Sequence, residues 1–338
     1  MKTLRMWTAG LAVLLTACER APMDATTRPD RDVDAARWAN TVQQTANPSC
    51  THRWGAGVNG SWFDATKWTP AAVPSVSDVA CVDAAGTYTV TLDPVVDATP
   101  IDIAALNLGA ASGIQTLRLS GSSLTLNVAL GIEIAPNGSL LFANFTGGTV
   151  SATSVTNDGL LKKTAQCGGC GTSDAINADI VNNGTIDVFG DLTWGKPNGA
   201  YANTGAIVIS GSPGIDIPAG TGAPTFAQNG GSVSAPTLAV LSMRAGTYTL
   251  NGGSIPPSVQ STLPIVRLEG ATLVLGAALG NATLGIRSDA SGNASVTGDV
   301  SATTTLWLMG AVAGTGIVTF VGSPTNFGKI RPDMNFFP

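Results

Sequence analysis

The sequence predicts an all-β protein, a right-handed parallel β-helix (β-solenoid) with about 21–25 residues per coil, and three observations lead to that fold class. The first is composition, because charged residues make up only 12% of the 338 residues while 41 glycines and 19 prolines indicate frequent turns. Glutamate occurs only at Glu19, Glu133 and Glu269, so the acidic residues are mostly aspartate, which favours turns over helix interiors. The second observation is a recurring turn signature, and the third is an alternation of apolar and polar residues after each copy of it.

The turn signature is an asparagine one or two positions before a glycine. Its copies have their glycines at Gly138, Gly159, Gly184, Gly205 and, in a looser form, Gly231. Successive glycines are 21, 25, 21 and 26 residues apart. A period of this size indicates a solenoid or a propeller, and it is too short for a propeller blade of about 40–45 residues. A coil of three short strands and three turns fits the period.

The alternation after each glycine predicts which residues face inward. The second residue after the glycine is apolar in every copy, at Leu140, Leu161, Ile186, Ile207 and Val233. Two positions further on lie Phe142, Lys163, Val188, Ile209 and Ala235. Because side chains alternate between the two faces of a strand, we expect these sets to stack as interior columns. The residues between them are expected to point outward: Leu141, Lys162, Asp187, Val208 and Ser234.

Two local expectations follow from this register. Lys163 is the charged exception in the inner columns, so we expect the coil near Cys167 to be distorted or looped out. The signature glycines are expected to supply positive φ at the turns, with the adjacent asparagines tolerating the left-handed conformation. A β-sandwich is the alternative fold, since it too consists of many short strands with turn signals. The recurrent spacing favours the solenoid.

The N-terminus predicts export and lipid attachment. Residues 1–17 combine a basic start with an apolar run that ends at Ala17, as a signal peptide does, and the run is shorter than the about 20 residues that span a bilayer. Leu15-Thr16-Ala17-Cys18 resembles the lipobox of bacterial lipoproteins. The resemblance implies a mature protein that begins at acylated Cys18, and Glu19 after it implies delivery to the outer membrane or cell surface. The alternative is an ordinary signal peptide with a chance cysteine.

Three further segments follow in the mature chain. Residues 18–49 are charged and predict a flexible lipidated tether, residues 50–95 an aromatic-rich N-terminal cap, and residues 96–338 the solenoid repeats. The pattern around Gly60-Ser61-Trp62-Phe63-Asp64-Ala65 resembles the segment that opens many bacterial secreted β-helical and autotransporter-like proteins. This resemblance implies architecture more than activity.

The tryptophans of the cap segment allow two interpretations. Trp54, Trp62 and Trp68 either plug the open end of the solenoid or form an aromatic platform that binds a sugar ring. We expect the plug, because a terminal coil exposes unpaired backbone and apolar surface.

The cysteines other than Cys18 are even in number, which suits an oxidising compartment. The most economical pairing joins Cys50 to Cys81 and Cys167 to Cys170, because each bond then closes a local loop. The Cys167–Cys170 pair is a CxxC pattern, for which we expect a structural disulfide, with a reducible thiol pair as the alternative.

The charged residues offer little organised chemistry. The strongest local cluster consists of Lys162, Lys163, Asp187, Asp191 and Lys196, in which Asp187 should lie one coil above Lys162 and form an ion pair. The sequence contains neither a P-loop nor a GxSxG elbow, and its single histidine, His52, excludes an HExxH zinc site. A Ser–His–Asp triad would have to use His52. Because the sequence lacks these cofactor- and metal-binding motifs, we expect no cofactor and no metal.

The function predicted from these observations is that of a non-enzymatic, envelope-anchored surface lipoprotein, acting as an adhesin, a stalk or a surface-binding component. Its partners would be the membrane, through the lipid anchor, and a polysaccharide or another surface protein. The formal net charge of −5 argues against nucleic acid. The alternative is a polysaccharide lyase or glycoside hydrolase on the same scaffold.

Overall fold

The computed structural model describes residues 48–55, 57–93, 100–164, 173–261, 263–276, 280–288, 294–309, 318–321 and 328–332. The chain divides into two units, residues 1–39 and 40–338, and all described residues belong to the second. The predicted signal peptide, Cys18, nearly all of the tether and the Cys167–Cys170 pair lie outside the described residues.

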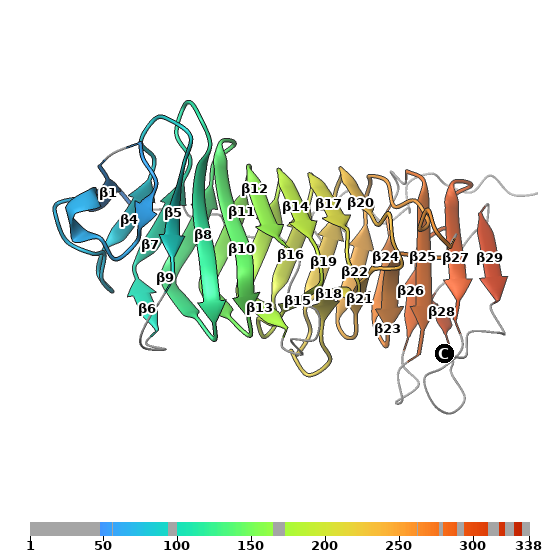
Figure 1. Ribbon diagram of the computed structural model, residues 1–338. Coiled ribbons are helices and arrows are strands. Elements are labelled where there is room, and N and C mark those ends of the chain that lie inside the picture. Colours follow the sequence, from blue (N-terminus) through green and yellow to red (C-terminus); the bar gives the residue numbers. More distant parts are fainter. Residues whose placement is uncertain are drawn as a thin grey trace, which may run out of the picture. The chain divides into compact units, whose positions relative to one another are not determined.

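The described residues form an all-β solenoid of about ten turns, which confirms the predicted fold class. Its strands follow one another along the stack in sequence order, from β1 (His52–Trp54) to β29 (Lys329–Pro332) (Figure 1). Strands of successive coils pair in parallel, as β12 (Leu160–Lys163) does with β14 (Thr185–Val188). This parallel pairing rules out the β-sandwich, whose sheets are antiparallel.

The coils present three strand faces. The first face is a separate sheet of eight strands, in the order β2 (Gly60–Ser61), β5 (Tyr88–Leu92), β8 (Gln115–Ser122), β10 (Gly138–Thr146), β12, β14, β17 (Ala206–Ile209) and β20 (Ser232–Ser234). The larger sheet supplies the other two faces. Three long strands cross from one of these faces to the other: β9 (Thr125–Ile134), β11 (Thr149–Asn157) and β13 (Asp174–Asn182).

Pairing on both sides of β13 separates the second and third faces, since its first half pairs with β15 and its second half with β16. The second face contains β6 (Ile101–Ile103), β15 (Asp191–Trp194), β18 (Gly214–Ile217), β21 (Val240–Met243), β23 (Val266–Glu269), β25 (Ala282–Arg287), β27 (Thr304–Leu308) and β29. The third contains β1, β4 (Val79–Val82), β7 (Ala105–Leu108), β16 (Ala200–Asn203), β19 (Thr225–Gln228), β22 (Thr247–Leu250), β24 (Thr272–Leu275), β26 (Ser295–Thr297) and β28 (Thr319–Val321).

The predicted interior column is confirmed in full. Its five residues pair one above the other across β10, β12, β14, β17 and β20, and each is completely buried: Leu140, Leu161, Ile186, Ile207 and Val233. The same column continues toward the N-terminus through Leu117 and Val90. Burial of a large aliphatic side chain stabilises a fold by about 1.5–3 kcal/mol, so this column is a major source of the solenoid's stability.

The stretch around Cys167, where a distortion was expected, lies outside the described residues, but Lys163 itself does not disturb its strand. Lys163 keeps the register of the second inner column, between Phe142 of the coil before and Val188 of the coil after. Its side chain is only 1% exposed and forms an ion pair with Asp174, at the start of β13. The charge is accommodated by a buried partner, and the strand therefore needs no bulge.

The positive φ expected for the signature glycines is confirmed at Gly231, where φ is 58°, and is corrected at the other four. Gly159, Gly184 and Gly205 do not have a positive φ. A Cβ atom on Gly184 would lie 2.3 Å from the carbonyl oxygen of Gly159, and one on Gly205 would lie 2.1 Å from that of Gly184. The turns are stacked so closely that a side chain at these positions would collide with the backbone of the preceding coil.

Three of the signature asparagines lie inside the solenoid, whereas Asn137 is partly exposed and Asn229 is exposed, and none of them has a left-handed backbone. Asn157, Asn182 and Asn203 are at most 1% exposed and form a ladder with Gln228. The side-chain amide of Asn157 donates to Asn182 at 2.7 Å, Asn182 donates to Asn203 at 2.7 Å, and Asn203 donates to Gln228 at 3.1 Å. Each amide donor thus pairs with the side-chain oxygen of the next residue, while the Oδ1 of Asn157 at the start of the ladder has no partner among the described residues.

The N-terminal end of the stack is filled by the three tryptophans of the cap segment. Trp54 and Trp68 meet edge to face with ring centroids 5.2 Å apart, and Trp62 packs on Trp68 at 4.8 Å. The short 3-10 helix η2 (Ala65–Lys67) leads into β3 (Trp68–Thr69), which pairs antiparallel with β1. Parallel pairing already includes β1 and β2, so the solenoid begins well before residue 96.

Cys50 and Cys81 form the expected disulfide, with Cα atoms 5.8 Å apart. Cys81 lies in β4 and Cys50 just before β1, so the bond connects the first two strands of the third face.

Candidate functional site

The charged cluster expected around Lys162 is divided among several places. Lys162 and Asp187 lie side by side on the outer side of the first face and form the predicted ion pair at 2.8 Å. Lys196 pairs instead with Asp179 at 2.9 Å. Lys163 is inside the solenoid, and Asp191 lines a pocket on the second face. These residues therefore do not form one catalytic cluster.

The alternative interpretation of the tryptophans, as a sugar platform, does not fit their burial. Trp54, Trp62 and Trp68 are at most 2% exposed, so none presents an indole face to a ligand. Two of the indole N–H groups donate to backbone carbonyls, Trp54 to Val58 at 3.0 Å and Trp68 to Trp62 at 2.8 Å, while that of Trp62 is buried without a partner among the described residues. This arrangement is what a plug requires.

The surroundings of His52 differ from those of a catalytic histidine. Its Nδ1 lies 3.2 Å from the carboxylate of Asp78 and 3.2 Å from the hydroxyl of Thr51. A catalytic triad needs the carboxylate and the nucleophile on opposite ring nitrogens. Here both oxygens approach the same nitrogen. A hydrogen bond from the Ser75 hydroxyl, the largest contribution, lowers the pKa of Asp78.

A potential metal-ligand group, Cys50, Cys81 and Asp83, lies beside the disulfide, with its ligand atoms within 4.8 Å of one another. Because the two sulfurs are bonded to each other, they offer no thiolates to a metal ion.

Among the residues that the structure describes, none of the helices has the length and apolar character to cross a membrane.

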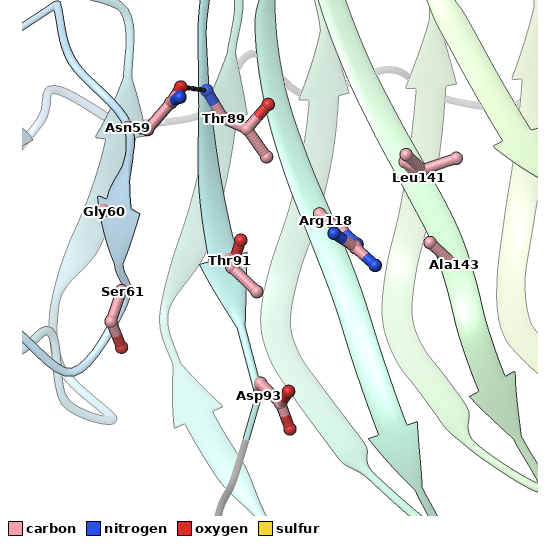
Figure 2. Close-up of a pocket in the computed structure, with 9 residues that line it drawn as sticks. All are labelled: Asn59, Gly60, Ser61, Thr89, Thr91, Asp93, Arg118, Leu141 and Ala143. Atoms are coloured by element: carbon pink, nitrogen blue, oxygen red, sulfur yellow. Dashed lines mark hydrogen bonds between the residues drawn. The ribbon is translucent and has the colours of Figure 1, made fainter.

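A candidate binding site is a concavity of about 740 Å³ on the outer side of the first face, here called the lateral groove. It is lined by Asn59, Gly60, Ser61, Thr89, Thr91, Asp93, Arg118, Leu141 and Ala143 (Figure 2). Strands β2, β5, β8 and β10 carry most of these residues.

The lateral groove follows directly from strand alternation. In β5 the inward residues Tyr88, Val90 and Leu92 are buried, so the threonines between them point outward. Parallel pairing then aligns Thr91 with Ser61 on one side and with Arg118 on the other. Figure 2 shows this row of side chains continuing to Leu141 on the next strand.

The groove combines neutral hydrogen-bonding groups with one cation. Asn59 accepts a hydrogen bond from the backbone of Thr89 at 2.8 Å, which fixes that end of the groove. The Nε of Arg118 is buried and has no hydrogen-bond partner among the described residues. Leaving a buried donor unpaired is costly. Asp93 lines the groove too, and Leu141 adds an apolar surface.

A second concavity of about 370 Å³, here called the charged pocket, lies on the second face. Its ionisable lining residues are Asp191, Asp216, Arg244, Arg267 and Glu269. Arg244 Nε lies 2.9 Å from Asp216, and Arg287 pairs with Glu269 at 2.6 Å. Burial raises the pKa of Asp216, and the charges of Asp191 and Glu269 add to this rise, whereas Arg244 opposes it. Burial and the nearby Arg287 lower the pKa of Arg267.

Sequence reasoning missed both concavities. The alternation in Thr87-Tyr88-Thr89-Val90-Thr91-Leu92 was sufficient to predict an outward threonine row. The charged pocket gives a weaker signal, because its strands lack the turn signature and their register follows only from the lengths of irregular connections. None of the protein-family models, curated proteins or solved structures compared with this chain matches it.

Proposed function

We propose that this protein is a non-enzymatic, envelope-anchored β-helical lipoprotein that binds a glycan chain in its lateral groove. The observation that carries the proposal is the lining of the groove, in which hydroxyl and amide groups surround the unpaired Arg118 donor. A polyhydroxylated chain offers matching donors and acceptors to such a surface. Its ring oxygens and hydroxyls can accept from the guanidinium.

The geometry of the first face suits an extended ligand. Its outward row continues from the groove through Lys162 and Asp187 in the following coils. Adjacent parallel strands lie about 4.8 Å apart, so the outward groups form a regular series along the stack. A linear polymer can contact several coils at once, which favours a surface-binding role over recognition of a small molecule.

The anchoring part of the proposal rests on the sequence around Cys18. Acylation of that cysteine would attach the protein to the envelope membrane and leave residues 19–49 as a tether. Replacing Cys18 with Ser should release the protein from the membrane fraction of the producing cells. Wild-type protein whose intact mass shows no attached lipid would contradict this part alone.

Binding is tested with a glycan array probed with the purified full chain in detergent. Arg118→Met and Thr91→Val should each weaken binding. For Arg118→Met, the lost hydrogen bond involves a charged group and is worth about 1.5–3 kcal/mol, which corresponds to about a ten- to hundredfold loss of affinity. Lys196→Met is the control, since it removes a cation that pairs with Asp179 away from the groove. Equal affinity of the groove variants and the wild type would refute the assignment.

The charged pocket supports a second candidate function, polysaccharide cleavage. Carboxyl groups with raised pKa values serve as general acids in glycosidases, and Asp216 has this property beside two further carboxylates. In that case the wild type releases new chain ends from a polysaccharide and Asp216→Asn does not. Asp187→Asn, a surface carboxylate on another face, is the control.

A further inference from the structure

Lys163 and Asp174 form a pair that the proposed binding function does not use. Their side chains are 1% and 0% exposed, and Lys163 Nζ contacts Asp174 Oδ2. The residues paired above and below them, Phe142, Val188 and Leu192, all belong to the hydrophobic core. The other carboxylate oxygen, Oδ1, accepts a hydrogen bond from the backbone N–H of Gly148 at 3.2 Å.

We propose that Lys163 and Asp174 become joined by an intramolecular amide bond between Lys163 Nζ and Asp174 Cγ. In this condensation the Nζ–Cγ bond forms and the Cγ–Oδ2 bond breaks. Two of the three ammonium protons leave with Oδ2 as one water molecule, and the third stays on the amide nitrogen. No oxidant, reductant or further reactant is required.

The contacts of the pair match the needs of this reaction. Nζ and Oδ2 are already in contact, so protons can pass between them without a third group. Reacting groups that are held close together and aligned for attack reach effective concentrations of up to about 10⁵–10⁸ M. The Gly148 N–H is directed at Oδ1, the oxygen that carries negative charge when Nζ attacks Cγ and that becomes the carbonyl oxygen of the amide.

Burial supplies a driving force for the condensation. Two full charges in an apolar interior carry a desolvation cost that their mutual attraction only partly offsets. The amide replaces them with a neutral group, and the released water moves to bulk solvent. The new bond would connect the end of β12 to the start of β13. It would hold both strands in register where the connecting segment is longest among the signature coils.

The test is mass spectrometry of the purified full chain, reduced, alkylated and denatured so that disulfides do not affect the result. The protein should weigh one water molecule less than its processed sequence. After digestion, the peptide containing Lys163 should be found covalently joined to the one containing Asp174. Tandem fragmentation then assigns the bond to Lys163 and excludes its neighbour Lys162.

Variants provide the controls. Lys163→Met should abolish the linked peptide, whereas Lys162→Met should retain it together with the loss of one water. Finding the two peptides separate in folded wild-type protein, with the Lys163 amine open to an amine-reactive reagent after denaturation, would overturn the proposal. That measurement needs only the wild type, so it remains decisive if a variant fails to fold. It is also independent of glycan binding.

Discussion

Lys162 and Lys163 are consecutive residues of β12, yet their side chains lie in opposite environments. Lys162 is 39% exposed and pairs with Asp187 on the outer side of the first face, whereas Lys163 is 1% exposed and pairs with Asp174 in the interior. The same contrast separates Ile186 from Asp187 and Asn182 from Asn183. Strand alternation alone assigns each residue to its side. How much a substitution at a residue costs in stability then depends first on that side.

The largest loss of stability is expected from placing a charge in the hydrophobic column. Ile186→Asp should unfold several coils, because Ile186 is completely buried between Leu161 and Ile207. Truncating such a residue costs about 2–5 kcal/mol, and an unpaired buried carboxylate should cost at least as much. Urea unfolding followed by circular dichroism measures the loss. A variant with the midpoint of the wild type would show that the column does not carry the fold.

The interior pair is the next most sensitive point. Asp174→Ala leaves the Lys163 ammonium buried without its acceptor, and breaking a buried pair in this way costs about 3–5 kcal/mol. The free energy of unfolding from urea titration reports this cost, with Asp187→Ala as the surface counterpart. Similar losses for the two substitutions would remove the distinction between inside and outside.

The asparagine ladder provides a neutral version of the same comparison. Asn182 accepts from Asn157 and donates to Asn203 in the interior, while Asn183 donates to Asp158 at 2.8 Å on the surface. Asn182→Ala removes the hydrogen bonds to both of these buried partners, so it should lower the free energy of unfolding by about 1–3 kcal/mol. Asn183→Ala should stay within about 0.5 kcal/mol of the wild type, as surface substitutions do. Thermal unfolding of the two variants in parallel tests the contrast.

Much of this contrast was predictable from the sequence, because period and alternation are local properties. They predicted the interior column, the outward Lys162–Asp187 pair and the parallel stack. They could not predict how Lys163 is neutralised, since its partner lies 11 residues further on and on a different face. Alternation assigns positions within one strand and does not say where the next strand begins relative to it.

The turn residues show a second limit of sequence reasoning. Asparagine and glycine together are typical of left-handed turns, and that interpretation was wrong at Asn182 and Gly184. Both residues are required by the preceding coil. Its backbone carbonyl lies too close to Gly184 for a Cβ atom, and its Asn157 side-chain amide donates to Asn182. A requirement that arises between coils becomes visible only when the coils are stacked. The lateral groove escaped prediction for the same reason, since its lining comes from four different strands.

A substitution on the outer side of the solenoid should change the free energy of unfolding least. Asp187→Ala removes the ion pair with Lys162 and the contact with the Ser210 hydroxyl at 3.2 Å, both at the solvent-facing side of β14. Exposed ion pairs contribute about 0–1 kcal/mol because water and salt screen them, so the free energy of unfolding should change by less than about 0.5 kcal/mol. Raising the salt concentration should shrink the difference further, whereas the cost of Ile186→Asp should persist. Urea titrations at low and high salt decide between these outcomes. A loss above about 2 kcal/mol would mean that Asp187, one residue from the column, belongs to the structural core after all.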